Sequence, residues 1–238
     1  MTSMILAAGK GTRLAPLTDT VPKALVEVGG VTMLERTARR LIEVGSTRLV
    51  VNTHHLGEQV RSFIAMKDRF GVETLVSEEP EEILDTGGGL LNAARFIGRD
   101  APFFLHNVDV LTDVALRPMY DYALGSDALA VLAVRENPTE RYLMFDDAGL
   151  CGFGNAATDS VTMVREHVGA GVRRGFTGIH VVSPRIFDLV TESGAFSIIA
   201  LYARLAAAGH SILPYPVDDA TWIDIGTPER LAAANRSL

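Results

Sequence analysis

Short apolar runs alternate with helical patterns along the first part of this chain, and that alternation limits the fold more than any other feature. The apolar runs cover residues 3–8, 48–52, 72–77, 102–107 and 127–134. Apolar residues with helical spacing cover residues 33–44, 57–67 and 90–97. The alternation predicts an α/β fold with a Rossmann-like, mostly parallel sheet that has helices on both faces.

Regularity is lost between about residues 138 and 175, where short apolar pieces are separated by many turn residues. We expect hairpins there, as an insertion or lid over one end of the sheet. Regular patterns return with a strand at 178–183, helices from 184 and near 197–208, and a closing segment at 221–235. No tandem repeat or low-complexity linker divides the 238 residues, so we expect a single domain.

Composition argues against several classes of partner. The 29 acidic residues exceed the 22 Lys and Arg, and a net charge of −7 disfavours nucleic acid and anionic membranes. No apolar stretch approaches the roughly 20 residues that span a bilayer, and the apolar residues 1–8 are too short for a signal peptide. Cys151 is the only cysteine, so no disulfide can form within the chain, and we expect a cytoplasmic protein.

A glycine-rich turn, G-K-G-T-R at residues 9–13, follows the first expected strand. Glycine lets backbone N–H groups approach an anion, and Lys10 and Arg13 add positive charge. Two of only three lysines, Lys10 and Lys23, lie within the first 23 residues. The turn is neither a Walker A loop nor a complete G-x-G-x-x-G motif, so by itself it leaves both a phosphate-binding loop and an ordinary turn open.

The turn begins a longer motif that resembles the signature of the sugar-1-phosphate nucleotidyltransferases. That signature reads roughly G-x-G-T-R-[LM]-x-P-L-T, followed after a short spacer by P-K-P-[LM]. Residues 9–25 follow it closely and depart at Ala24, where the family usually has proline. The resemblance implies transfer of a nucleoside monophosphate from a nucleoside triphosphate to a sugar 1-phosphate, with release of pyrophosphate. It also implies a nucleotide-binding part at about 1–110 and a sugar-binding part at about 111–238.

Within this motif the resemblance implies roles for named residues. Nucleotide binding is assigned to Leu6, Ala7, Ala8, Gly9, Lys10, Gly11, Thr12 and Arg13. Arg13 would also stabilise charge at the α-phosphate and the leaving pyrophosphate, and Lys23 would hold phosphate oxygens at the reacting centre. We predict Arg13 and Lys23 as catalytic residues, with a solvated side chain as the alternative for Lys10 and for Lys23.

Two aspartates are predicted to hold Mg²⁺, because phosphoryl-type transfer relies on a metal that bridges phosphate oxygens. Magnesium prefers one or two carboxylates, and open α/β sheets bind ligands at the carboxyl ends of their strands. Asp109 ends the run N-V-D, where the family often has N-G-D. Asp224 lies in W-I-D-I-G-T-P, which is close to the family's W-x-D-[IV]-G-T-P. The alternatives are a turn cap for Asp109 and a strand-edge acid for Asp224.

Contacts to the base are expected from D-T-G-G-G at residues 85–89. Three glycines permit close approach of the backbone to a flat ring, and the start of the following helix offers free N–H groups. A flexible turn capped by its threonine is the alternative. Other polar side chains follow the second and third expected strands on the same sheet edge. The candidates on this side are Asn52, Glu78, Glu79, Thr86, Gly87 and Gly88.

Contacts to the sugar are implied by the resemblance for Asn107, Glu166 and Gly178. Gly178 lies in F-T-G-I-H, which is similar to a glycine-containing strand that lines the family's sugar pocket. Glu166 lies in V-R-E-H, where the family has V-E-K-P. The histidines lack zinc-ligand spacing and Cys151 has no paired base in its neighbourhood. We therefore predict direct attack by the sugar phosphate, without a covalent intermediate.

The compact length and these motifs most resemble the branch of the family that transfers a uridylyl group to N-acetylmuramate 1-phosphate in cell-wall recycling. The mannose-1-phosphate guanylyltransferases come second. We therefore expect Mg²⁺, UTP or GTP, a sugar 1-phosphate, and a monomer or homodimer. A regulatory subunit that binds sugar nucleotide without turnover stays open, on the substitutions at Ala24 and Val108. Against it, Arg13, Lys23 and both aspartates are all present.

Overall fold

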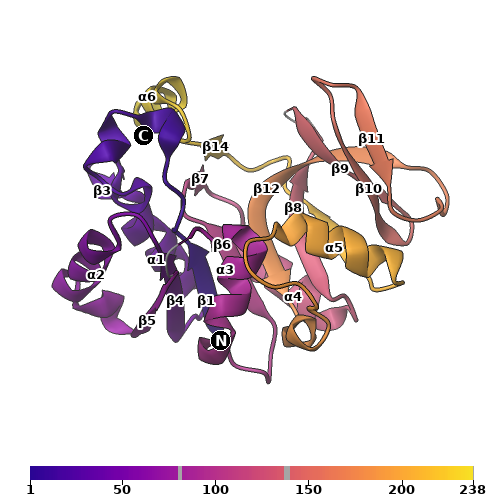
Figure 1. The fold of residues 1–238 in the computed structure, drawn as a ribbon, viewed down its shortest axis with the longest axis horizontal. Helices are drawn as coiled ribbons and strands as arrows, with labels where there is room; N and C mark the ends of the chain where they lie inside the picture. The colour runs from indigo at the N-terminus through magenta and orange to yellow at the C-terminus, as the bar shows by residue number, and fades with distance from the viewer. Residues whose placement is uncertain (80–81, 137–139, 238) are drawn as a thin grey trace.

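One sheet runs through the computed structural model, which describes residues 1–79, 82–136 and 140–237 (Figure 1). Its strands follow the order β11-β10-β9-β12-β6-β1-β4-β5, with β8 added on β12 and β13 added on β8. The predicted α/β architecture with a Rossmann-like sheet is confirmed. The expected single domain stays a prediction.

The half that contains the N-terminus is parallel. Strand β1 (Thr2–Leu6) lies between β4 (Arg48–Thr53) and β6 (Phe103–Asn107), and β5 (Glu73–Glu78) pairs with β4. All four were expected within one or two residues. Because the carboxyl ends of parallel strands meet at one edge of a sheet, the polar residues that follow these strands come together there.

Helices cover both faces of this half. They are α1 (Met33–Glu43), α2 (Gly57–Met66), α3 (Asp85–Ala93) and α4 (Leu116–Gly125). Successive strand residues point to opposite faces. Accordingly, Ile5 packs with Leu34 and Leu41 of α1 in one buried cluster, whereas Met4 packs with Leu90 of α3 in another. The expected helices on both faces are confirmed.

The other half is mainly antiparallel, and the hairpins expected around 138–175 are present. The strands are β8 (Ala130–Arg135), β9 (Arg141–Asp146), β10 (Gly149–Asn155), β11 (Ser160–Met163), β12 (Val172–Val182) and β13 (Ile212–Pro216). Strands β9, β10 and β11 follow one another antiparallel, and β9 pairs with the first part of β12. In Figure 1 they stand opposite α6 (Pro228–Arg236), across the middle of the molecule.

Two expected helices differ from the structure. The helix expected at 90–97 begins earlier, at Asp85, so its glycines lie inside α3. The helix expected from 184 is only a short 3-10 turn, η6 (Pro184–Asp188), whereas α5 (Ile198–Ala207) lies where a helix was expected.

Short pieces were missed, because two or three residues give no recognisable period. They are β2 (Glu27–Val28), β3 (Val31–Thr32) and β7 (Val110–Thr112), the last of which pairs with β14 (Trp222–Asp224). Within the described parts of the chain, no helix combines the length and apolar character that crossing a membrane requires.

Candidate active site

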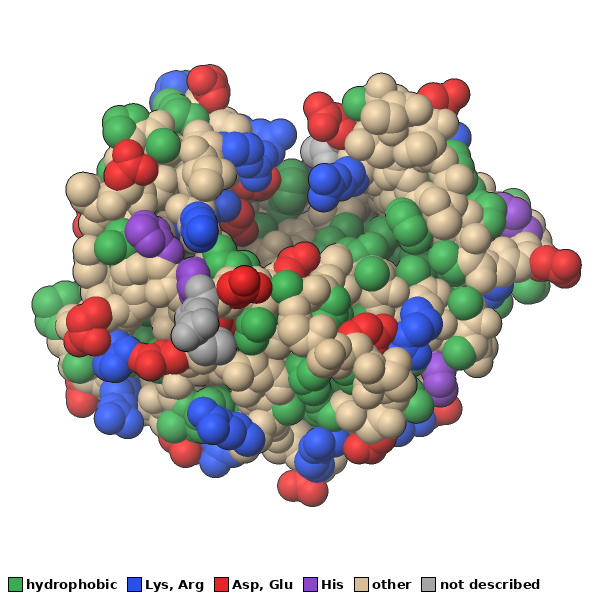
Figure 2. Space-filling model, viewed as in Figure 1, with side chains coloured by type: hydrophobic (Ala, Val, Ile, Leu, Met, Phe, Trp, Pro, Cys, Tyr) green, Lys and Arg blue, Asp and Glu red, His purple; other side chains and the backbone are tan. Residues whose placement is uncertain are grey.

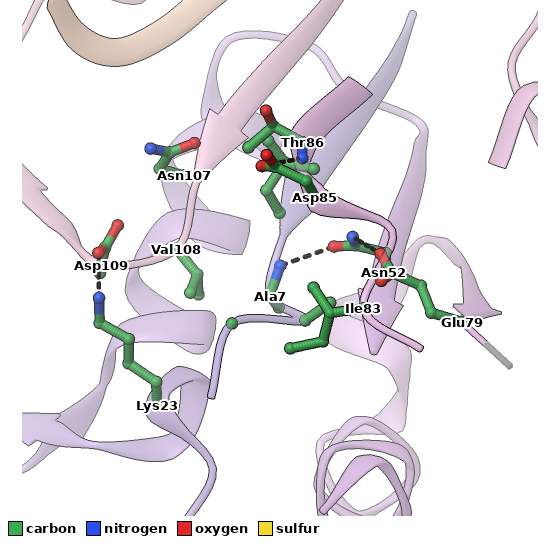
Figure 3. Close-up of a pocket in the computed structure, with 13 residues that line it drawn as sticks. Ala7, Lys23, Asn52, Glu79, Ile83, Asp85, Thr86, Asn107, Val108 and Asp109 are labelled. Atoms are coloured by element: carbon green, nitrogen blue, oxygen red, sulfur yellow. Dashed lines mark hydrogen bonds and ion pairs between the residues drawn. The ribbon is translucent and has the colours of Figure 1, made fainter. Parts of the chain in front are cut away.

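A cavity of about 190 Å³ lies at the carboxyl ends of β1, β4 and β6 (Figure 3). It is the position at which open α/β sheets bind ligands. Half of the candidate residues named from the sequence line it, namely Leu6, Ala7, Ala8, Gly9, Lys23, Asn52, Glu79, Thr86, Asn107 and Asp109. Lys10, Thr12 and Arg13 are exposed and lie outside this lining.

The opening motif folds back on itself. Gly11 has a left-handed backbone with φ 68°, and a Cβ there would lie 2.9 Å from Cγ2 of Thr18 and 3.3 Å from Cβ of Lys23. The Thr18 hydroxyl donates to the Gly11 carbonyl at 2.8 Å. Glycine is therefore required at position 11 for close packing as well as for its backbone angle. This packing brings Lys23 beside the loop at residues 9–13.

Lys23 and Asp109 form an ion pair across 86 residues of sequence (Figure 3). Their side chains are 12% and 19% exposed. Lys23 comes from the short turn η3 (Lys23–Leu25), and Asp109 follows β6. The sequence suggested separate phosphate and metal roles for these two residues, and the fold places them in direct contact.

Asp224 lies on the strand beside Asp109. It pairs in register with Val110, and the backbone N–H of Ile225 donates to the Asp109 carbonyl at 2.9 Å. Its carboxylate accepts from the Gly226 N–H at 2.7 Å and from Nη1 of Arg230 at 3.0 Å. Both predicted metal ligands thus lie at the pairing of β7 with β14, where Asp224 ends β14 and Asp109 directly precedes β7.

Arg13 lies against the closing motif. A Cβ on Gly226 would fall 2.8 Å from Nη2 of Arg13 and 2.7 Å from Oδ1 of Asp224. The first and last motifs of the chain therefore touch. Arg230 joins this group from the first turn of α6, and the sequence reading missed it. Its position just after the G-T-P turn was the only signal that could have found it.

Asn52 holds the start of the glycine-rich loop by a hydrogen bond to its backbone. Its Oδ1 accepts from the Ala7 N–H at 2.7 Å, and its Nδ2 donates to Oε1 of Glu79 at 2.6 Å. Oε2 of Glu79 accepts from the Leu84 N–H at 2.8 Å. Both side chains are buried, so these bonds satisfy groups that would be costly to leave unpaired. Of the two glutamate candidates, Glu79 lines the cavity, whereas Glu78 pairs with Arg61 at the surface.

Comparison with known proteins decides the family. Residues 2–168, more than two thirds of the chain, match the nucleotidyl transferase family. The chain belongs to this family. A relative in Neisseria meningitidis, N-acetylmuramate alpha-1-phosphate uridylyltransferase, is 32% identical, and the match covers 98% of this chain and 96% of the relative. The predicted class, a sugar-1-phosphate nucleotidyltransferase, is confirmed at the level of the family.

Two other comparisons agree with that placement. A mannose-1-phosphate guanyltransferase of Kluyveromyces lactis is 30% identical, over 96% of this chain and 62% of its own length. The crystal structure of a putative glucose-1-phosphate thymidylyltransferase from Bacillus anthracis superposes with a TM-score of 0.81 at 19% identity, covering 100% of this chain and 95% of that one. The last similarity concerns the fold alone.

Gly87 and Gly88 of this transferase have a different local role from the one expected. Their N–H groups are not free, because both donate to the Phe196 carbonyl, at 2.9 and 3.3 Å. A Cβ on Gly87 would lie 2.9 Å from that oxygen, and one on Gly88 would overlap the Gly194 carbonyl. The glycines let α3 pack closely against the loop at 194–196. The expectation of free N–H groups at a helix start was therefore wrong.

Thr86 lines the cavity but does not cap a flexible turn. Its hydroxyl accepts from the N–H of Ile198, at the start of α5, at 2.9 Å. This bond connects the parallel half to a second and larger cavity, of about 550 Å³, between α5 and strands β9 to β11. The parallel half and the antiparallel half are thus directly joined at this point.

On the sugar side the structure brings two of the three candidates together. A Cβ on Gly178, whose φ is 83°, would lie 2.7 Å from Nδ2 of Asn107. Glycine at 178 therefore leaves room for the Asn107 side chain. Glu166 is exposed and is absent from the linings of both cavities, so the fold does not bring it to the other two.

The expectation that Cys151 has no base nearby was wrong. The thiol is buried on β10, 3.7 Å from Nδ1 of His167, and it donates to the Met144 carbonyl at 3.3 Å. Burial raises the pKa of the thiol above its ordinary value. Neither residue lines either cavity. The pair is therefore poorly suited to nucleophilic catalysis.

Beside this pair, Asp146 is held by the guanidinium of Arg165, which keeps the pKa of that carboxyl well below its usual range. The Val168 N–H donates to the same carboxylate at 2.8 Å, and the Ala148 N–H at 2.9 Å. The carboxylate is thus saturated with hydrogen bonds. The cluster ties the turn between β9 and β10 to the segment at 165–168.

Proposed function

We propose that this transferase joins the uridylyl group of UTP to N-acetylmuramate 1-phosphate and releases pyrophosphate. The observation that carries the proposal is the meeting of three distant motifs at one end of the sheet, through Lys23–Asp109 and Arg13–Gly226. The name of the Neisseria relative, whose length this chain covers almost completely, supports the choice of substrates.

In the proposed reaction the chain acts mainly by placing two polyanions and offsetting their repulsion. Lys23 and Arg13 supply positive charge near the α-phosphate, where charge builds up in the transition state. The loop at residues 6–13 holds the nucleotide, and Asn107 and Gly178 face the sugar. The attacking phosphate oxygen is already an anion at neutral pH, so direct in-line attack needs no general base and no covalent intermediate.

The residues present fit a magnesium ion. Asp109, directly before β7, and Asp224, at the end of β14, offer hard oxygen ligands, and Mg²⁺ is usually held by one or two carboxylates. Oδ1 of Asp109 accepts no hydrogen bond from the part of the chain that the structure describes, so it is available to a cation. When bound, the ion would neutralise charge on the phosphates.

The proposal is tested by pyrophosphate release with four nucleoside triphosphates and a panel of sugar 1-phosphates. We expect UTP with N-acetylmuramate 1-phosphate to give the highest kcat/KM. GTP with mannose 1-phosphate as the best pair would replace this assignment, and ATP as the best donor would refute it. No turnover with any pair would favour a subunit that binds sugar nucleotide without catalysis.

The proposal also includes the cytoplasm as location and a monomer or homodimer as the state of assembly. Both rest on the sequence alone. Equilibrium sedimentation of the purified chain distinguishes the monomer from the homodimer.

A further inference from the structure

The second cavity has an ordered wall, which follows from the register of three strands. Asn155 of β10 pairs with Arg141 of β9 on one side and with Ser160 of β11 on the other. Directly paired residues point to the same face of a sheet, so these three side chains form one polar row. All three line the cavity, and Ser197 at the start of α5 lies in the same lining.

An apolar row lies beside the polar row. Phe153 pairs with Leu143 in the next register position on the same face, and Phe176 of β12 belongs to the same lining. Figure 2 shows hydrophobic side chains on the wall of the hollow under strands β9 to β11. The cavity therefore offers an apolar surface next to a polar edge, as sugar and small-molecule pockets usually do.

The charge of this cavity is unusual for an acidic protein. Among the residues that the structure describes, Arg141 is the only charged one in its lining, and none of the lining residues carries a carboxylate. The first cavity differs, since its lining contains the acids Glu79, Asp85 and Asp109 as well as Lys23. A pocket with one cation and no acid, in a chain of net charge −7, favours a ligand group that is negatively charged.

The polar row lies at the end of the wall that is nearest the reacting centre. Arg174 of β12 pairs with Leu143 of β9, and the two strands are antiparallel. Phe176 and Gly178, further along β12, therefore lie toward the end of β9 that contains Arg141. Gly178 contacts Asn107, in the first cavity. A sugar whose 1-phosphate lies near Asn107 can thus extend its ring substituents toward the row of Arg141.

We propose that the second cavity selects a hexose 1-phosphate that bears a carboxylate on a side arm. Arg141 pairs with that carboxylate. This inference rests on the proposed function and names Arg141 as the residue that distinguishes an acidic from a neutral sugar 1-phosphate. A guanidinium binds a carboxylate through two parallel hydrogen bonds, which a neutral hydroxyl cannot provide. Asn155 and Ser160 hydrogen-bond to the same arm, and the apolar row packs against its carbon atoms.

The experiment compares two substrates that differ only in the acidic arm, N-acetylmuramate 1-phosphate and N-acetylglucosamine 1-phosphate, each with UTP. We expect Arg141→Gln to lower kcat/KM about tenfold to a hundredfold for the acidic sugar, the range of a lost charged hydrogen bond. For the neutral sugar it should change less than about twofold. The preference of the wild-type enzyme should therefore be largely lost.

Arg173→Gln is the matched control. Arg173 stacks on Tyr142 at 4.7 Å and pairs with Met144, which puts it on the opposite face of the same sheet from Arg141. It should leave the preference unchanged. Equal losses on both sugars in Arg141→Gln, or no loss on either, would overturn the inference while wild-type turnover upheld the proposed function. A wild-type preference for the neutral sugar would also overturn it. No turnover with any sugar 1-phosphate would overturn both.

Discussion

The two cavities described above, one beside Lys23 and one beside Arg141, differ in how charge is arranged in them. In the first, a cation and an acid from distant motifs, Lys23 and Asp109, pair with one another. In the second, Arg141 is the only charged side chain among the described lining residues, and rows of paired strand residues form the wall. The first arrangement suits chemistry that is the same for every sugar, and the second suits the choice of one sugar. Changes to the two cavities should therefore have different kinetic signatures.

The largest effect should come from the first cavity. Asp109→Asn should lower kcat by about a hundredfold to a thousandfold with every sugar 1-phosphate, because it removes charge from the reacting centre. Asp121→Asn, at an exposed i,i+4 pair with Arg117, is the control and should be near wild type. Steady-state rates with two different sugars measure both. A loss confined to one sugar would contradict the division between the cavities.

The next largest effect should come from the two predicted catalytic cations, Lys23 and Arg13. Lys23→Ala and Arg13→Ala should each lower kcat by about tenfold to a hundredfold and change KM for the nucleotide less, since their charge acts mainly in the transition state. Lys10→Ala tests the neighbouring exposed lysine, which lies outside the lining, and should change kcat less than about threefold. If only KM rose in the Lys23 variant, that residue would contribute uniform binding instead.

The contact between α3 and the loop at 194–196 can be weakened at Gly88, which lines neither cavity. Gly88→Ala places a Cβ against the Gly194 carbonyl and should cost about 1–3 kcal/mol in the free energy of unfolding. Gly125→Ala, where a Cβ meets nothing within 4 Å, is the control. Urea denaturation followed by circular dichroism compares the two. An unchanged midpoint for Gly88→Ala would show that α3 and the loop at 194–196 can separate cheaply.

The smallest effect concerns two buried histidines, His106 and His180, which lie where the two halves meet at the pairing of β6 with β12. Burial lowers the pKa of His106 to about 4 and that of His180 to about 3. In the unfolded chain both titrate near 6.5, so the unfolded state binds more protons below that pH and stability falls as pH falls. Between pH 7 and pH 6 the expected loss is about 0.7 kcal/mol for each histidine.

Urea denaturation at the two pH values measures this loss. His106→Asn should remove about half of the pH dependence, and His55→Gln, at an exposed position, should retain all of it. A slope that stayed the same in the His106 variant would mean that other groups cause the acid sensitivity.

Much of the fold and part of the site could be predicted because the signals are local. Strands β1, β4 and β6 contain short apolar runs, since both faces of that part of the sheet are covered. Asp109 was found because a polar residue after a parallel strand must lie at the ligand-binding edge. Three contacts were not predicted, because each joins residues that are separated in sequence. They are Asn52–Glu79, Cys151–His167 and Gly87–Phe196.

The sequence by itself determined the alternation of elements, the turn at Gly11 and the two motifs that identify the family. These depend on backbone preferences and on spacing within one turn or strand. Only the tertiary structure decided that Lys23 pairs with Asp109, that α3 packs on the loop at 194–196, and that Arg141 lines a cavity with no acid among its described residues. Such contacts are set by how strands pair and helices pack, and no local pattern in the chain encodes which distant partner fills a given space.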